Sequence, residues 1–162
     1  MPKSVEVTTP SEREIKVMRR FDAPARLVFD FHTKPEHVQK WLLGPPGWSM
    51  PICEIDLRVG GGYRYIWRGP GSAQMGMRGV YREIVAPERL VSTEVFDQPW
   101  YEGEAVGTLV LVEHDGQTTA TTTVRYASQA VRDGVLKSPM ATGVSAGLDA
   151  LEVLLASLGG AS

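Results

Sequence analysis

The chain has 162 residues and a net charge of −2, and 43% of its residues are hydrophobic while 22% are charged. This composition is typical of one globular domain and excludes a disordered chain, and the balanced charge excludes the basic excess that attracts nucleic acid or anionic lipid. The single cysteine, Cys53, excludes an internal disulfide and indicates a reducing compartment, which we expect to be the cytoplasm. No apolar run reaches the ~20 residues of a membrane-spanning helix.

The N-terminal region is predicted to be a loose arm followed by a strand. Residues 1–12 show no sustained periodicity and lack the apolar core of a signal peptide, so we assign them to the arm and residues 13–158 to a single domain. Apolar and polar residues alternate over residues 13–21, which predicts a strand with one mostly apolar face.

Two short helices are expected next. Asp22 is the predicted N-cap of a helix over residues 24–31, because its carboxylate can accept from the free amides of the first turn. Residues 33–36, Thr-Lys-Pro-Glu, form a capping-box pattern with proline in the first turn. This pattern predicts a second helix that ends at Trp41.

The middle of the chain alternates strand-like segments with turn signals. Asp115-Gly116 is typical of a tight hairpin turn, and Ala86-Pro87-Glu88 is a short connection. Such close spacing favours an antiparallel meander over parallel units joined by helices. The predicted strands cover residues 50–57, 63–68, 75–85, 89–96, 104–113 and 118–126.

The C-terminal segment is predicted to be one long helix. Ser138-Pro139 is a favourable start and Gly159-Gly160 a favourable end. An apolar stripe runs between them at spacings of three and four residues: Met140, Val144, Leu148, Leu151 and Leu155. The expected architecture is therefore α+β, with a curved seven-stranded antiparallel sheet whose apolar face is covered by this helix.

Several segments, in this order, resemble one protein family. They are Phe21-Asp22-Ala23-Pro24, Val28-Phe29, Pro35-Glu36-His37, Trp41, residues 56–61, residues 83–91, Thr93-Glu94, Asp115-Gly116 with Thr118, and Met140 with Gly143. Over residues 13–158 the chain resembles the activator of heat-shock-protein-90 ATPase homologue family, in the START and birch-pollen-allergen-like helix-grip superfamily. The resemblance implies a helix-grip fold with a cavity between sheet and helix. It leaves the occupant open, because members include small-molecule binders, polyketide cyclase-like proteins and a co-chaperone domain.

One position departs from the family pattern. The family often has tryptophan after the glycine that is Gly143 here, whereas this chain has Val144, with Ala146 and Gly147 close by. Either the smaller side chain leaves extra room under the helix, or another aromatic side chain fills the space.

Aromatic residues are the main candidates for the cavity wall. Tyr63, Tyr65 and Trp67 share one face of a strand by alternation, which suits a flat, partly polar ligand or, alternatively, an ordinary core. Trp48 follows a Gly-Pro-Pro-Gly loop near the expected cavity mouth, where it is either a lid or a loop anchor. The remaining candidate ligand contacts are Tyr81, Phe96, Leu111, Met140, Val144 and Leu148.

Three charged residues fall on otherwise apolar strand faces. They are Arg19, Glu83 and Glu94. A buried charge needs a partner, so we expect Arg19 to pair with Glu83 or Glu94 inside the domain. The three are then polar anchors for a ligand or, alternatively, a structural ion pair or residues at an open rim.

No catalytic or cofactor motif is present in the sequence. His32 and His37 are five residues apart across a helix break, which is not the spacing of a zinc site on one helix. The glycines at 60–62 lack the spacing of a phosphate loop. We therefore expect no metal, no cofactor and no catalytic residue.

The function predicted from the sequence is binding of a small hydrophobic or aromatic molecule, without catalysis. One alternative is a cyclase- or hydratase-like enzyme that uses Glu83 or Glu94 as acid or base. Another is a co-chaperone-like regulator of an ATPase, although the eukaryotic activator has a further domain for which this chain has no room. We expect no nucleic-acid or membrane partner, and we take a homodimer as the expected oligomer because it is the commonest oligomer among soluble proteins in general.

Overall fold

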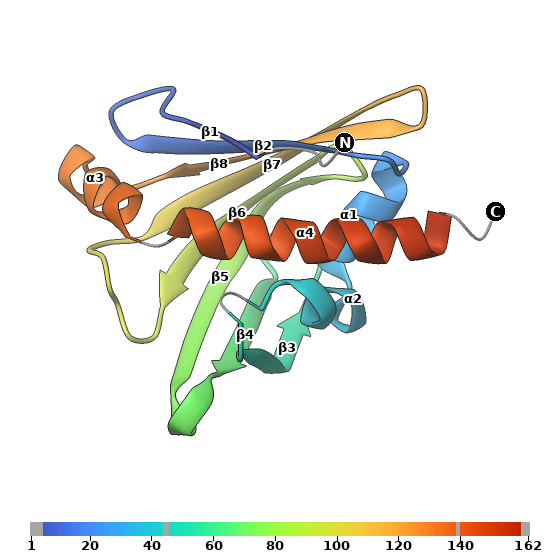
Figure 1. Cartoon of the computed structure of the whole chain (residues 1–162). Coiled ribbons are helices and arrows are strands. Elements are labelled where there is room, and N and C mark those ends of the chain that lie inside the picture. The colour runs from blue at the N-terminus through green and yellow to red at the C-terminus, as the bar shows by residue number, and fades with distance from the viewer. Residues whose placement is uncertain (1–4, 44–45, 139, 160–162) are drawn as a thin grey trace.

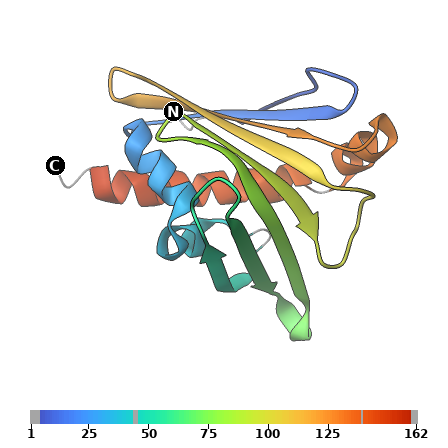
Figure 2. The ribbon, with the colours of Figure 1, turned by 180° about the vertical axis from the view of Figure 1, so that it is seen from behind.

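The architecture is α+β, with an open antiparallel sheet that curves around one long helix (Figure 1). The computed structural model describes residues 5–43, 46–138 and 140–159, with the side chains of 140–142 excepted. In the reverse view the strands lie in front of the long helix, so the helix covers the inner face of the sheet (Figure 2). The predicted fold class is confirmed.

The sheet has eight strands in the spatial order β1-β2-β8-β7-β6-β5-β4-β3. Their bounds are β1 (Glu6–Thr8), β2 (Glu14–Phe21), β3 (Ser49–Ile55), β4 (Gly62–Arg68), β5 (Gln74–Val85), β6 (Arg89–Phe96), β7 (Ala105–His114) and β8 (Gln117–Arg125). The predicted count of seven strands is wrong because residues 6–8, assigned to the loose arm, pair antiparallel with β2. All three residues of β1 are exposed, so the strand has no apolar alternation that could have revealed it.

Four α-helices accompany the sheet. They are α1 (Ala25–Thr33), α2 (Pro35–Trp41), α3 (Gln129–Lys137) and α4 (Met140–Gly159), and a 3-10 turn covers Pro70–Ser72. Helix α4 is the predicted C-terminal helix, whereas α3 was not predicted. Ser128 caps α3 by accepting a hydrogen bond from the Val131 amide at 3.2 Å.

Both predicted helix caps are wrong. Pro24 is the N-cap of α1, and the Glu113 carboxylate, from β7, accepts from the Ala25 amide at 2.7 Å. Thr33 is the last residue of α1, and its hydroxyl donates back to the Phe29 carbonyl at 2.9 Å. At α1 a carboxylate from a distant strand replaces the predicted local cap, and at α2 the predicted cap residue Thr33 belongs to the preceding helix instead.

The core lies between the second half of α4, helix α1 and the sheet. Leu151 and Leu155 of α4 are 0% and 1% exposed, and they belong to one buried cluster with Phe21, Val28 and Phe31. None of the helices in the described part of the chain is long and apolar enough to cross a membrane.

Candidate ligand-binding cavity

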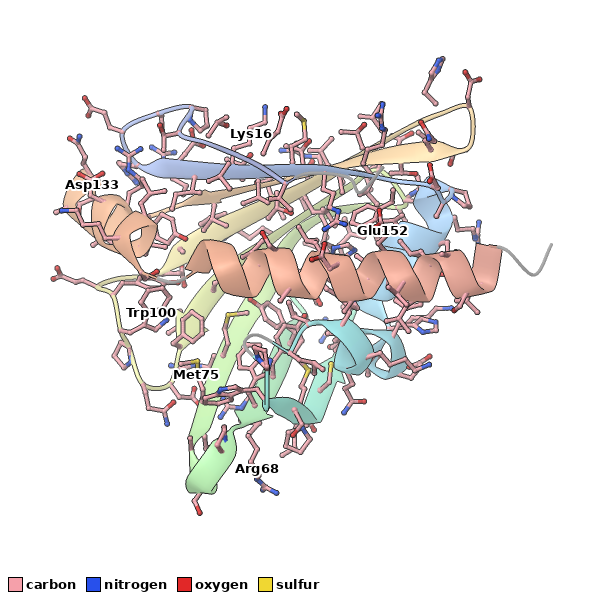
Figure 3. All side chains as sticks on the ribbon, in the orientation of Figure 1. Lys16, Arg68, Met75, Trp100, Asp133 and Glu152 are labelled. Carbon is pink, nitrogen blue, oxygen red and sulfur yellow. The ribbon has the colours of Figure 1, made fainter. Side chains whose placement is uncertain are left out.

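A cavity of about 570 Å³ lies between the first half of α4 and the concave face of the sheet. Strands β2 and β4–β8 and all four helices contribute side chains to its wall. Its volume is within the range of small-molecule sites. Figure 3 shows Met75 and Trp100, two of the lining residues, below the beginning of α4.

Strand β4 gives the cavity an aromatic wall. Tyr63, Tyr65 and Trp67 all line it, with ring centroids 4.8 Å apart for the first pair and 5.8 Å for the second. The Tyr63 hydroxyl donates to the Thr93 carbonyl at 2.6 Å, and Trp67 Nε1 donates to the Leu42 carbonyl at 2.8 Å. Because backbone carbonyls satisfy the polar ends of Tyr63 and Trp67, these two rings are fixed in place in the cavity wall.

The opposite wall is made by small residues of α4. Gly143, Val144, Gly147 and Leu148 line the cavity. A Cβ added at Gly143 would have nothing within 4 Å, and one at Gly147 would lie 3.4 Å from the Trp41 carbonyl oxygen. Gly147 therefore allows α2 to approach α4 closely, while the space under Gly143 and Val144 belongs to the cavity.

Glu94, on β6, is the only acidic side chain among the described residues that line the cavity. These residues include no lysine or arginine. Burial raises the pKa of its carboxyl to about 7. The carboxylate has no hydrogen bond or ion pair with any residue in the described ranges. Gly107 on the neighbouring strand makes room for it, since a Cβ there would lie 3.0 Å from Glu94 Oε2.

Tyrosines surround this carboxylate. Burial raises the pKa values of Tyr63, Tyr101 and Tyr126, and the nearby negative charge of Glu94 raises them further. Tyr81 also lines the cavity, and it is only 2% exposed. Its hydroxyl oxygen is buried and has no hydrogen-bond partner among the residues that the structure describes.

The structure brings most of the predicted site residues together at this cavity. Those that line it are Trp48, Tyr63, Tyr65, Trp67, Tyr81, Glu94, Phe96, Val144 and Leu148. Trp48 packs over Gly69, where an added Cβ would come within 2.5 Å of its Cε2. The side chain of Met140 lies outside the described part of the chain, and so does the Gly44-Pro45 half of the loop before Trp48.

Arg19 does not line the cavity, and its predicted pairing with Glu83 or Glu94 is wrong. Its Nη1 lies 2.7 Å from Asp149 Oδ1, and its Nη2 lies 3.2 Å from Glu152 Oε2. Both carboxylates follow the last cavity-lining residue of α4, Leu148, and Figure 3 shows Glu152 on the side of α4 that faces β2. Arg19 therefore attaches α4 to β2.

Glu83 and Leu111 also lie outside the cavity lining. The register between β5 and β6 shifts between Tyr81 and Glu83, so the alternation that predicted an inward Glu83 is broken there. Its side chain is exposed and pairs with Arg89 at 2.9 Å. Leu111 is 3% exposed and packs in the core instead.

The sequence reasoning missed the contribution of the loop between β6 and β7. Trp100 and Tyr101 both line the cavity, and the Tyr101 ring lies 5.4 Å from that of Tyr126 and 5.8 Å from that of Phe96. A loop has no periodicity that could show where its side chains point. His32 of α1 was also missed as a lining residue; it hydrogen-bonds the Val28 carbonyl at 2.8 Å, and burial lowers its pKa.

The described residues offer little for metal or nucleophile chemistry. No group of three or more His, Cys, Asp or Glu side chains that could hold a metal is found among them. Burial, together with Glu36 and Glu54, raises the pKa of the Cys53 thiol to about 11, so this thiol stays protonated at neutral pH.

Comparisons with known proteins agree with this fold. The family model of activator of Hsp90 ATPase homolog 1-like proteins matches residues 22–156. A crystal structure of a protein from Rhodobacter sphaeroides has a TM-score of 0.89 and 30% sequence identity, covering 94% of this chain and 98% of that one.

More distant structures share the fold. The protein Ms6760 from Mycobacterium smegmatis has a TM-score of 0.83 and 23% identity, over 95% of this chain and 97% of that one. CalU16 from Micromonospora echinospora has a TM-score of 0.61 and 20% identity, over 95% and 85% of the two chains. A search of the curated proteins finds no match.

Proposed function

We propose that this chain, which belongs to the family of activator of Hsp90 ATPase homolog 1-like proteins, binds a small hydrophobic or aromatic molecule under α4 without catalysing a reaction. The START-like fold of this family commonly binds hydrophobic ligands. The observation that carries the proposal is the cavity of about 570 Å³ with its wall of fixed aromatic rings. Burying an apolar ligand there removes both its surface and these rings from water, which favours binding by about 25 cal/mol per Å².

A neutral apolar fluorophore, N-phenyl-1-naphthylamine, tests this proposal. We expect saturable binding at one site, and a several-fold weaker affinity in Trp67→Ala. This change removes an indole that lines the cavity and is stacked with Phe96, with the ring centroids 6.4 Å apart. Leu158→Ala, at a half-exposed position near the end of α4, is the control and should bind like the wild type. Non-saturable binding, or equal affinities in all three proteins, would contradict the proposal.

A second candidate function is general acid–base catalysis by Glu94. The observation that favours it is an isolated carboxyl beside open cavity volume, with a pKa of about 7 that suits proton transfer at neutral pH. Glu83 no longer supports this alternative because it is exposed and paired with Arg89. The test is a substrate screen. If the wild type turns a compound over, and Glu94→Gln still binds that compound with the same affinity but no longer turns it over, the protein is an enzyme and the proposal of binding without catalysis is wrong.

The setting of the protein is also part of the proposal. A cytoplasmic location and the absence of nucleic-acid and membrane partners remain predictions from the sequence, and a homodimer remains a prediction from the frequency of dimers among soluble oligomers. Fractionation of the producing cells and light scattering of the purified chain would test the first two.

A further inference from the structure

We infer, on the basis of the proposed function, that the ligand is an apolar or aromatic molecule with a single protonated amine, which binds between the Glu94 carboxylate and the tyrosines around it. The proposal begins from the charge of the cavity wall. Its described lining residues include one carboxylate, one histidine and no lysine or arginine. A ligand that carries one positive charge would therefore meet one negative charge and no competing cation.

The second step is that the Glu94 carboxylate has no partner among the described residues. A carboxylate that is partly removed from water is unfavourable unless a hydrogen bond or an opposite charge compensates it. The Glu94 side chain is half-buried in the cavity wall. Glu94 has no hydrogen bond or ion pair with the described residues, and the glycine at position 107 clears space around its Oε2. A ligand can thus be the partner that the described residues do not supply.

The side chains that face Glu94 favour a cation. Tyr63 and Tyr65 come from β4, Tyr101 from the β6–β7 loop and Tyr126 from just after β8, and none of them carries a charge at neutral pH. Tyrosine ring faces attract ammonium groups, and this attraction is strongest in a desolvated site. The Tyr63 hydroxyl already donates to the Thr93 carbonyl, so it does not donate to Glu94.

Tyr81 provides a second polar contact for the same group. Tyr81 pairs with Ser92 across β5 and β6, so Glu94 is its diagonal neighbour on the inner face. Diagonal residues in a sheet are about 7–8 Å apart, which long side chains can bridge. An ammonium group has three N–H donors, and the unpartnered Tyr81 hydroxyl oxygen can accept one while Glu94 accepts another.

Three probes that share a naphthalene ring test the inference: 1-naphthylmethylamine, 1-naphthalenemethanol and 1-naphthoate. Each competes with N-phenyl-1-naphthylamine at pH 8. We expect the amine to bind about tenfold or more tightly than the neutral alcohol, and the acid to bind most weakly. In Glu94→Gln the preference for the amine should disappear while the alcohol keeps its affinity, which also shows that the variant is folded.

Glu83→Gln is the matched control, because it makes the same chemical change at an exposed carboxylate outside the cavity. Its amine preference should equal that of the wild type. If the alcohol or the acid binds as tightly as the amine, or if Glu94→Gln keeps the preference, the inference is wrong while the cavity remains a binding site. If no probe competes and the fluorophore itself does not bind, the proposed function fails as well.

Discussion

Glu94 is the residue on which the chemistry of the cavity depends. Its carboxyl is surrounded by aromatic rings and aliphatic side chains, so the charged form loses hydration without gaining a protein partner among the described residues. This is the physical reason why its pKa rises to about 7. The cavity wall therefore changes its charge near neutral pH.

The same residue makes the stability of the fold depend on pH. In the unfolded chain the Glu94 carboxyl titrates near 4.5, and in the folded chain near 7. Between these values the folded state binds more protons, so the free energy of unfolding falls as the pH rises, and the full loss is reached above pH ~7. We expect Glu94→Gln to be more stable than the wild type at pH 8 by up to about 3 kcal/mol, and the difference to vanish near pH 4.

Urea unfolding at pH 4, 6 and 8 measures this prediction. Glu83→Gln is again the control, and its stability relative to the wild type should not change with pH in this way. A stability difference for Glu94→Gln that is the same at pH 4 and pH 8 would contradict the assigned cause.

Strand alternation predicted most of the inward residues because a continuous strand has a fixed period of two. It succeeded for the β4 aromatics, for Glu94 and for the inward position of Arg19. It failed for Glu83, where one irregularity between β5 and β6 reverses the faces. It also could not choose the partners of Arg19, because Asp149 and Glu152 lie 130 residues or more away on α4. A pairing of that range depends on how the helix docks, which periodicity does not encode.

At the scale of elements, α4 has two different halves. Its first half carries Gly143, Val144 and Gly147 over the cavity, and its second half carries Leu151 and Leu155 into the core. The ion pairs from Arg19 to Asp149 and Glu152 hold the middle of the helix against β2. The helix is thus attached firmly at one end and stands over open volume at the other.

The docking of α4 can be tested at Leu151. This side chain is 0% exposed in the main cluster, so Leu151→Ala should lower the free energy of unfolding by about 2–5 kcal/mol. Val153→Ala, two residues away and 69% exposed, should change it by no more than about 0.5 kcal/mol. Chemical denaturation of both variants measures this contrast, and similar values for the two would mean that α4 does not dock as described.

The elements that the sequence predicted are those with strong periodicity or clear turn residues. The six strands from β3 to β8 and the long α4 had both. Helix α3 was missed because it is only nine residues long, so its apolar side, formed by Val131 and Val135, is too short a pattern to stand out. The β6–β7 loop was missed as part of the site because a loop has no periodicity, and because the Tyr101 ring packs against Tyr126, which is distant in the sequence, as well as against the nearby Phe96.

At the scale of the whole molecule, the cavity follows from the mismatch between a curved sheet and a straight helix. The helix can contact the sheet closely at only part of its length, and here large leucines fill the contact at one end. At the other end small residues leave the volume open, with Tyr63, Tyr65 and Trp67 on the facing strand. The replacement of the tryptophan that the family often has after Gly143 by Val144 is consistent with this open volume.

Val144→Trp tests whether that volume is the binding site. The indole should enter the cavity instead of displacing packed atoms, so we expect the free energy of unfolding to change by less than about 1 kcal/mol, whereas overpacking a filled core costs about 1–3 kcal/mol or more. Because the ring occupies the space that a ligand would use, the affinity for N-phenyl-1-naphthylamine should fall at least about tenfold, which corresponds to about 1.4 kcal/mol.

The matched control is Val28→Trp, at a position of α1 that is 0% exposed and fully packed, where the same substitution should prevent stable folding. Urea denaturation and fluorophore titration of the two variants separate these outcomes. Val144→Trp that unfolds like Val28→Trp would show that the space is already filled, and a stable Val144→Trp with undiminished affinity would show that the ligand binds elsewhere.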